Sequence, residues 1–134
     1  MARLFLGFKM EGIFRQAVEV AKSSTSKKKV GCLLLSKNKV IQEATNIETK
    51  SHPTQAKFAR MVGLKEKIYL HAEISALVKC RQGGADTIVV ARVNSLGYLR
   101  MAKPCPICQL AIKEAGISKV FYSTNNGFVG EFYG

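Results

Sequence analysis

The stretch HAEISALVKCRQGGADTIVVARVNSLGYLRMAKPCPIC, residues 71–108, contains the side chains that decide how this chain is interpreted. A histidine and a glutamate lie two residues apart at its start, and two cysteines lie three residues apart at its end. The four residues are His71, Glu73, Cys105 and Cys108. Between them, a helical pattern stops at a glycine pair and an apolar strand follows. The question is whether this spacing forms a catalytic metal site or brings four polar residues together by chance.

Two thiolates and one imidazole are the ligand set of a catalytic zinc site, which keeps its fourth position open for water. His71 begins one predicted helix, and Cys105 and Cys108 begin another. A helix N-terminus carries unsatisfied N–H groups and the positive end of the helix dipole, which favours thiolates. The other two cysteines, Cys32 and Cys80, have no ligand partner at a typical spacing. The pattern therefore predicts one catalytic Zn²⁺ ion bound by three side chains.

Glu73 lies two residues beyond His71, so it is close to the predicted metal without having to be a ligand. Zinc activates water at neutral pH, and a neighbouring carboxylate can take the proton of that water and deliver it elsewhere. We therefore interpret Glu73 as the general acid and base of a hydrolytic reaction. The alternative is a zinc-free core that simply buries a cysteine pair and a histidine at the start of a helix.

Hydrophobic periodicity predicts helices that alternate with strands, which is typical of a three-layer α/β sandwich. We expect helices at about 12–23, 70–80 and 104–115, and strands at 30–36, 40–46, 86–93, 117–124 and 128–133. Residues 47–68 are expected to form a loop with one helical turn near 55–61. Too few residues follow Ser123 for a parallel crossover, so the last two strands should pair antiparallel through an Asn-Asn-Gly turn.

Composition limits the class of protein. The 134 residues are the size of one compact domain, so we expect 1–134 to form a single domain. The net charge of +12 indicates a polyanionic or phosphorylated partner, although solubility alone is an alternative. No apolar run approaches the ~20 residues of a membrane span, and MARLFLGF is too short for a signal core. We therefore expect a cytoplasmic protein, no membrane partner, and cysteines that are reduced or bind metal.

Three stretches resemble the cytidine and deoxycytidylate deaminase superfamily: HAEISAL, KPCPICQLAIKEAGISKVFYS and VGCLLLSKNKVIQEATN. H-x-E followed by P-C-x-x-C is the signature of zinc nucleobase deaminases. The resemblance extends over about residues 12–132. It implies a cytidine deaminase-like fold, a three-layer α/β/α sandwich with a five-stranded mixed sheet. It also implies one catalytic zinc ion and, as is common in the superfamily, a homo-oligomer.

The resemblance also implies a role for each matching position. His71, Cys105 and Cys108 hold zinc, and Glu73 shuttles protons between the water, the ring nitrogen and the leaving amine. Three further residues are expected to bind the substrate: the backbone N–H of Ala72 and the carbonyl of Pro104 contact the base and its amino group, and the side chain of Asn46 contacts sugar or base. For Asn46 the alternative is an ordinary turn residue.

Further substrate contacts are predicted from position alone. Arg100 and Lys103 precede the cysteine motif and should lie near the mouth of the site, where either could hold a 5′-phosphate or a strand backbone. The alternative is a solvated basic surface. Tyr98 and Tyr122 are candidate walls for the base, and His52 belongs to the long predicted loop. Each of these three could equally be a core or surface residue.

The identity of one ligand indicates the branch of the superfamily. Nucleoside deaminases typically have cysteine where this chain has His71, whereas histidine is usual in the deoxycytidylate, transfer-RNA adenosine and polynucleotide branches. The expected substrate is the cytosine of a free nucleotide or nucleoside, with deoxycytidylate favoured and uracil and ammonia as products. One alternative is the same reaction on cytosine in single-stranded DNA or RNA. A second is a non-catalytic zinc-containing module that binds nucleic acid.

Overall fold

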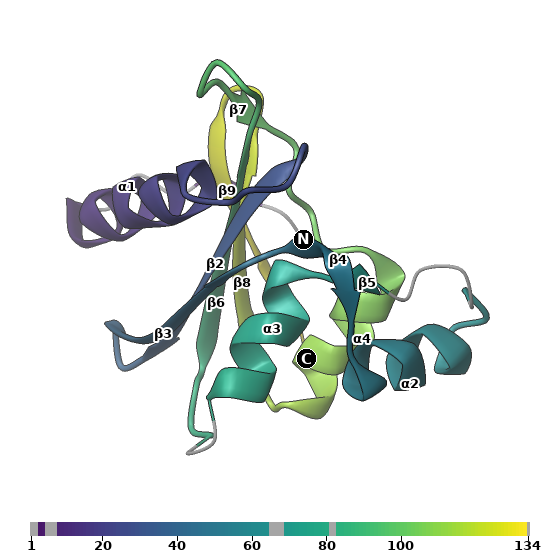
Figure 1. Cartoon of the computed structure of the whole chain (residues 1–134). Coiled ribbons are helices and arrows are strands. Elements are labelled where there is room, and N and C mark those ends of the chain that lie inside the picture. Colours follow the sequence, from purple (N-terminus) through teal and green to yellow (C-terminus); the bar gives the residue numbers. More distant parts are fainter. Residues whose placement is uncertain (1–2, 5–7, 65–68, 81–82, 134) are drawn as a thin grey trace.

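The computed structural model describes residues 3–4, 8–64, 69–80 and 83–133, and its central feature is a mixed sheet (Figure 1). The strands follow the order β1-β9-β8-β6-β2-β3, and β7 pairs with β6 outside this path. Only β6 and β8 pair in parallel. The five long strands are β2 (Lys29–Ser36), β3 (Lys39–Thr45), β6 (Thr87–Val93), β8 (Lys119–Thr124) and β9 (Gly127–Phe132).

These five strands confirm the predicted fold class and the predicted mixed sheet. Two strands of two residues each extend the sheet beyond the prediction, β1 (Arg3–Leu4) beside β9 and β7 (Leu99–Arg100) beside β6. The antiparallel pairing of β8 with β9 is confirmed, with Thr124 opposite Gly127. A separate small sheet pairs β4 (Ile47–Ser51) with β5 (Tyr69–Leu70).

Helices cover both faces of the sheet and produce three layers (Figure 1). α1 (Phe8–Lys22) lies on one face, whereas α3 (Ala72–Lys79) and α4 (Pro106–Glu114) lie on the other. Successive side chains of a strand point to opposite faces, and β2 follows this rule. Its Leu33 and Leu35 belong to the core under α1, and its Cys32 and Leu34 belong to the core under α3 and α4.

The contact between α1 and β2 is unusually close at Gly31. A Cβ atom at this position would overlap the backbone nitrogen of Ala21, and it would lie 2.8 Å from the Cα of Ala21 and 2.9 Å from the carbonyl oxygen of Ala17. These neighbours are backbone atoms, which cannot turn aside as a side chain can. Glycine at this position therefore allows the helix to pack directly on the strand.

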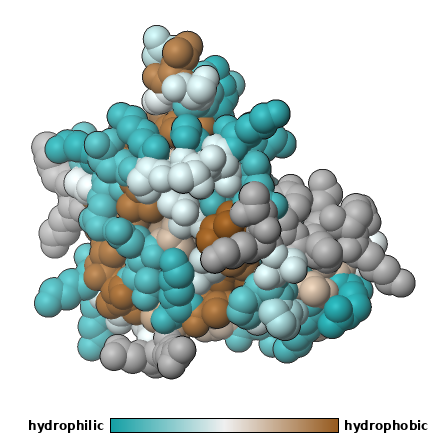
Figure 2. All heavy atoms as spheres, viewed as in Figure 1, coloured by the Kyte–Doolittle hydropathy of each residue, from teal (hydrophilic) through white to brown (hydrophobic). Residues whose placement is uncertain are grey.

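The hairpin made by β6 and β7 ends in a projecting loop. Leu96 is 77% exposed and Tyr98 is 62% exposed on this loop. Figure 2 shows apolar atoms at this projecting end, at the top of the view. The loop itself is ordered by Asn94, whose side-chain oxygen accepts hydrogen bonds from the backbone nitrogens of Leu96 and Tyr98 at 3.0 and 2.9 Å.

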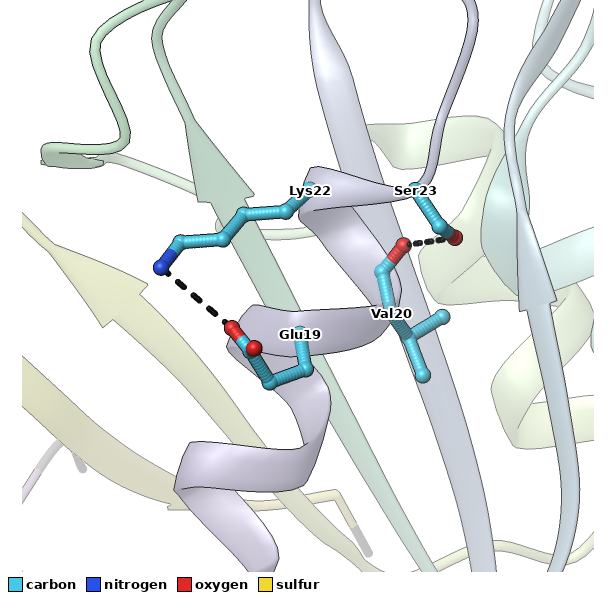
Figure 3. A network of polar contacts seen from close by, with 4 residues as sticks. All are labelled: Glu19, Val20, Lys22 and Ser23. Atoms are coloured by element: carbon cyan, nitrogen blue, oxygen red, sulfur yellow. Dashed lines mark hydrogen bonds and ion pairs between the residues drawn. The ribbon is translucent and has the colours of Figure 1, made fainter.

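The predicted helix at 12–23 is confirmed in position, but it begins earlier, at Phe8. Figure 3 shows the last turn of this helix, α1. The Nζ of Lys22 lies 3.3 Å from the carboxylate of Glu19, and the hydroxyl of Ser23 donates to the carbonyl of Val20 at 2.6 Å. The same carbonyl also accepts a hydrogen bond from the backbone nitrogen of Ser23 at 3.0 Å, so Ser23 closes the C-terminus of the helix through both groups.

The segment predicted as a long loop contains more regular structure than expected. Besides β4 it contains a full helix, α2 (Pro53–Met61), which packs outside α3 and α4. His52 caps this helix, because its Nδ1 accepts a hydrogen bond from the backbone nitrogen of Thr54 at 3.1 Å. Proline at the first helical position is pre-organised for a helix start. The predicted turn near 55–61 is therefore the greater part of a helix whose first two residues, Pro53 and Thr54, were missed.

Candidate functional site

The candidate site is built at the N-termini of α3 and α4. His71 is the N-cap residue of α3 and Cys105 is the N-cap residue of α4, with Cys108 one turn further along. The Nδ1 of His71 lies 3.3 Å from the Sγ of Cys108 and 3.5 Å from the Sγ of Cys105. The three ligand atoms all lie within 4.8 Å of one another. No other group of three or more potential ligands occurs among the residues that the structure describes.

Neither cap residue uses its side chain to cap its helix. A side chain at an N-cap normally accepts a hydrogen bond from the first turn. Here the imidazole and the thiol point toward each other instead. The hydrogen bond with Cys108 lowers the pKa of the Cys105 thiol to about 4, so Cys105 carries negative charge near neutral pH. A cation is therefore favoured at this point.

The donor set fits a zinc ion. Two sulfurs and one imidazole nitrogen within 4.8 Å are what a site with one open position needs, since Zn–S and Zn–N distances are about 2.3 and 2.1 Å. Cys32 and Cys80, the two other cysteines, do not belong to this group. The metal-ligating residues predicted from the sequence are thus brought together by the fold.

Glu73 lies in the first turn of α3 and is 5% exposed. Burial raises the pKa of its carboxyl group, and the nearby His71 imidazole opposes part of that rise. A carboxyl group whose pKa is raised toward neutrality exchanges protons more readily at working pH. Glu73 therefore has the environment of a general acid and base.

A second helix orients one of the ligands. Gln55 of α2 is fully buried, and its side-chain oxygen accepts a hydrogen bond from the backbone nitrogen of His71 at 3.2 Å. This hydrogen bond acts on the backbone that carries the imidazole, and so supports the position of the ligand without contacting its ring. The long segment before α3 thus contributes to the site through a residue that sequence reasoning missed.

The candidate metal ligands open onto a cleft of about 360 Å³. It lies between the loop before α4, the ends of β2 and β6, and the start of α3. Its polar lining contains both basic and acidic side chains. The lining residues are Lys28, Val30, Asn46, Glu48, Leu64, His71, Ala72, Glu73, Val90, Arg92, Met101, Ala102, Lys103, Cys105, Pro106 and Ile107.

Asn46 is buried in the cleft wall, and its amide is already engaged by the chain. The side-chain oxygen accepts hydrogen bonds from the hydroxyl of Ser24 at 2.8 Å and from the backbone nitrogen of Val30 at 3.2 Å. The side-chain nitrogen donates to the carbonyl of Lys28 at 2.6 Å. Asn46 therefore orders the loop between α1 and β2. Its predicted contact with sugar or base stays a prediction.

Four residues predicted to bind substrate lie in or beside the cleft. Ala72 and Lys103 line it, together with Asn46. Pro104 precedes the N-cap of α4, and its carbonyl accepts a hydrogen bond from the Gln109 side chain at 2.8 Å. The Nζ of Lys103 lies 3.6 Å from the carboxylate of Glu131, which offsets its charge.

The other predicted substrate contacts lie outside the cleft lining. His52 caps α2, and Tyr98 is exposed on the β6–β7 loop. Tyr122 is 4% exposed and belongs to the core between the sheet and the helices α3 and α4. Arg100 lies on β7, where its guanidinium donates to the carbonyl of Leu99 at 2.9 Å.

The cleft also contains two cations that sequence reasoning did not assign to it, Lys28 and Arg92. Arg92 is the single charged residue in the apolar strand TIVVARV. A charge in an otherwise buried strand is a signal that could have identified it. Lys28 belongs to a run of three lysines, which reads as a solvated loop and gives no such signal.

The chain belongs to the family described as "Cytidine and deoxycytidylate deaminase zinc-binding region", whose family model matches residues 9–124. This match contains all three candidate ligands and Glu73. No curated protein matches the chain. No helix in the described parts of the chain is long and apolar enough to cross a membrane.

Solved structures of deaminases share the fold. The apo dCMP deaminase from the cyanophage S-TIM5 is 21% identical with a TM-score of 0.58, covering 87% of this chain and 84% of that chain. The same enzyme in complex with dCMP and dUMP has a TM-score of 0.57 at 21% identity, covering 88% and 83%. Cytidine deaminase from Mycobacterium leprae is 21% identical with a TM-score of 0.52, covering 86% and 87%. At this identity the likeness establishes the fold.

Proposed function

We propose that residues 1–134 form a zinc-dependent deaminase domain that converts the cytosine of a free nucleotide or nucleoside to uracil and releases ammonia. Deoxycytidylate is the favoured substrate. The observation that carries the proposal is the buried carboxylate of Glu73 beside a His71, Cys105 and Cys108 cluster that opens onto one cleft. A structural metal site has no need of such a carboxylate.

His71, Cys105 and Cys108 would hold the zinc ion, which supplies a Lewis acid that activates water for attack at the C4 carbon of cytosine. The Glu73 carboxylate takes a proton from the attacking water and gives it to the N3 nitrogen of the ring. It then takes the remaining water proton and gives it to the leaving amino group. The water oxygen forms the new bond to C4, the bond from C4 to the amino nitrogen breaks, and the nitrogen leaves as ammonia.

The surrounding residues position the base in this scheme. The backbone N–H of Ala72, at the start of α3, donates to the base, and the carbonyl of Pro104 accepts from its amino group. The carbonyl of Pro104 already accepts from Gln109, and a carbonyl oxygen has a second lone pair for the substrate. The chain is proposed to act in the cytoplasm and to assemble as a homo-oligomer, as is common in the superfamily.

Cytosine in single-stranded DNA or RNA is the second candidate substrate. It is favoured by the exposed Tyr98, which lies on the same hairpin as Arg100. Aromatic side chains beside cations bind single strands by stacking and charge. A non-catalytic zinc-containing module that binds nucleic acid is the alternative from a different class.

Ammonia release decides among these candidates. Purified zinc-loaded protein is incubated with deoxycytidine, deoxycytidylate and a cytosine-containing oligonucleotide, and Glu73→Gln is the control. Turnover of deoxycytidylate that Glu73→Gln abolishes while retaining zinc is the expected result. Turnover of the oligonucleotide alone would support the second candidate. Retained zinc without turnover of any of the three would favour the non-catalytic module.

A further inference from the structure

Two arginines lie directly opposite each other on neighbouring strands. The register of β6 and β7 pairs Arg92 with Arg100 and Val93 with Leu99. Residues that are directly opposite in an antiparallel pair point to the same face. Val93 and Leu99 pack on the α1 side. Arg92 and Arg100 therefore both face the side of the sheet that carries α3, α4 and the cleft.

Like charges directly opposite each other destabilise a sheet, so the pair needs a partner of opposite charge. Two ion pairs occur among the described residues, Lys22 with Glu19 and Lys103 with Glu131, and neither contains an arginine. Within the described parts of the chain, the Arg100 guanidinium donates a hydrogen bond to the carbonyl of Leu99, a neutral acceptor, and forms no ion pair. Both arginines are partly exposed. The arrangement leaves them available to an anion.

Arg92 connects this pair to the candidate metal centre. It lines the cleft together with His71 and Cys105. On its other side it pairs with Val30 of β2, two residues after the cleft lysine Lys28. Cations thus follow one another from Lys28, just before β2, to Arg92 of β6 and Arg100 of β7. The β6–β7 hairpin extends beyond α3 and α4 in Figure 1, so this strip lies at an open end of the sheet.

The carboxylates of the cleft do not neutralise the strip. Glu48 faces the backbone nitrogens of Lys27 and Lys28 at 3.4 and 3.5 Å. Glu73 lies beside the thiols. Lys103, the other cation of the cleft, already lies 3.6 Å from Glu131. An anion at the edge of the cleft therefore meets Arg92 in the lining and Arg100 on the neighbouring strand, and neither forms an ion pair among the described residues.

We propose that Arg92 and Arg100 form a phosphate-binding site, which holds the phosphate on the 5′ oxygen of the nucleoside whose base enters the cleft. The inference rests on the proposed function and narrows its substrate class to phosphorylated nucleosides. Guanidinium groups match phosphate because each presents two N–H donors in a fixed plane. Adjacent strands are about 4.8 Å apart, so one phosphate group can contact both side chains. A bound phosphate would offset the repulsion between Arg92 and Arg100, which the pairing of β6 with β7 places opposite each other.

The test is binding to the zinc-loaded protein by titration calorimetry, which requires no turnover. The probes are deoxyuridine 5′-monophosphate, deoxyuridine, and a thymidine-deoxyuridine dinucleotide whose single phosphate is a diester 5′ to the uracil nucleoside. Arg92→Gln and Arg100→Gln are compared with Arg15→Gln, which removes the same charge from the exposed side of α1. We expect Arg92→Gln and Arg100→Gln each to weaken binding of the monophosphate by about 10- to 100-fold. Binding of deoxyuridine and the behaviour of Arg15→Gln should stay unchanged.

Equal losses for the monophosphate and deoxyuridine, or no loss for either, would overturn the phosphate site. If the arginines matter for the dinucleotide more than for the monophosphate, the site exists and serves a nucleic acid strand. Thermal unfolding gives a second readout: at the same concentration, the monophosphate should raise Tm of the wild type more than Tm of Arg92→Gln. If the protein binds the monophosphate through these arginines but releases no ammonia from deoxycytidylate, the proposed deaminase activity is wrong and the phosphate site stands. If the wild type, Arg92→Gln and Arg100→Gln all deaminate deoxycytidine and deoxycytidylate at equal rates, the phosphate site is wrong and the deaminase activity stands.

Discussion

The side chain of Asn46 donates a hydrogen bond to the carbonyl of Lys28 over 2.6 Å, which ties the end of β3 to the loop that precedes β2. The same amide accepts hydrogen bonds from Ser24 and Val30. A buried amide that makes three hydrogen bonds inside the chain orders its surroundings. The wall of the cleft at this point is therefore preformed.

Replacing Asn46 should cost stability as well as activity. Asn46→Ala removes three hydrogen bonds, each worth about 0.5–1.5 kcal/mol, so we expect the free energy of unfolding to fall by about 2–4 kcal/mol. Ser24→Ala removes one of them and should cost about 1 kcal/mol. Urea unfolding measures both. A loss for Asn46→Ala no larger than for Ser24→Ala would contradict the bracing role.

Cys108→Ser should lose the metal, because a serine hydroxyl is a far weaker zinc ligand than a thiolate. Cys80→Ser is the matched control, since Cys80 lies at the end of α3 and outside the ligand group. Elemental analysis of protein purified from zinc-supplemented cells gives the readout. We expect about one zinc per chain in the control and in the wild type, and almost none in Cys108→Ser. Equal zinc in all three would remove Cys108 from the site.

Gln55→Met should weaken zinc binding without touching a ligand. The side chain keeps its bulk but no longer accepts from the backbone nitrogen of His71. Partners that contact a ligating group directly are worth about 10- to 100-fold in metal affinity, so for this backbone contact we expect a loss of about 10-fold at most. Competition with a coloured chelator measures the affinity. Gln42→Met on β3 makes the same chemical change away from the site, and an identical effect in both would point to a general loss of stability.

Gly31→Ala should destabilise the protein, because its new Cβ atom would overlap the backbone of Ala21. Overpacking of this kind costs about 1–3 kcal/mol. Gly12→Ala is the control: no atom lies within 4 Å of its Cβ position, and it is in the interior of α1. Alanine there should raise the free energy of unfolding by about 0.5–1 kcal/mol. Chemical denaturation of the two variants should therefore give opposite signs.

Asp86 should make stability sensitive to acid. Hydrogen bonds from the backbone nitrogen of Lys37 and the hydroxyl of Thr87 lower the pKa of its carboxyl group. A group with a lowered folded-state pKa stabilises the fold above its unfolded pKa of about 3.9, and this contribution is lost as pH falls through the folded pKa. Asp86→Asn should flatten the stability profile below about pH 4. An unchanged slope in urea unfolding between pH 5 and pH 2 would refute this.

The sequence was sufficient to predict the long elements and the residues that the fold gathers at the candidate metal centre, whose role as ligands stays a prediction. Continuous apolar runs in β2 and β6, the helical periodicity of α3 and the turn residues of the hairpins predict the layers, and residue type and spacing single out His71, Cys105 and Cys108. Positions that depend on what another element brings near them were missed. Gln55 acts through a backbone group sixteen residues away. The lone charge in β6 marks Arg92, but its position opposite Arg100 depends on the register of β7, which no local pattern encodes.

The imidazole of the candidate metal centre precedes its two thiols by 34 and 37 residues in the chain. During synthesis on a ribosome, the histidine is therefore exposed well before either sulfur. β6 is made in that interval, so the complete ligand set appears only once most of the central sheet exists. A chain that is released early, before Cys105, would have no way to retain the ion, and metal content would report on whether translation passed this point.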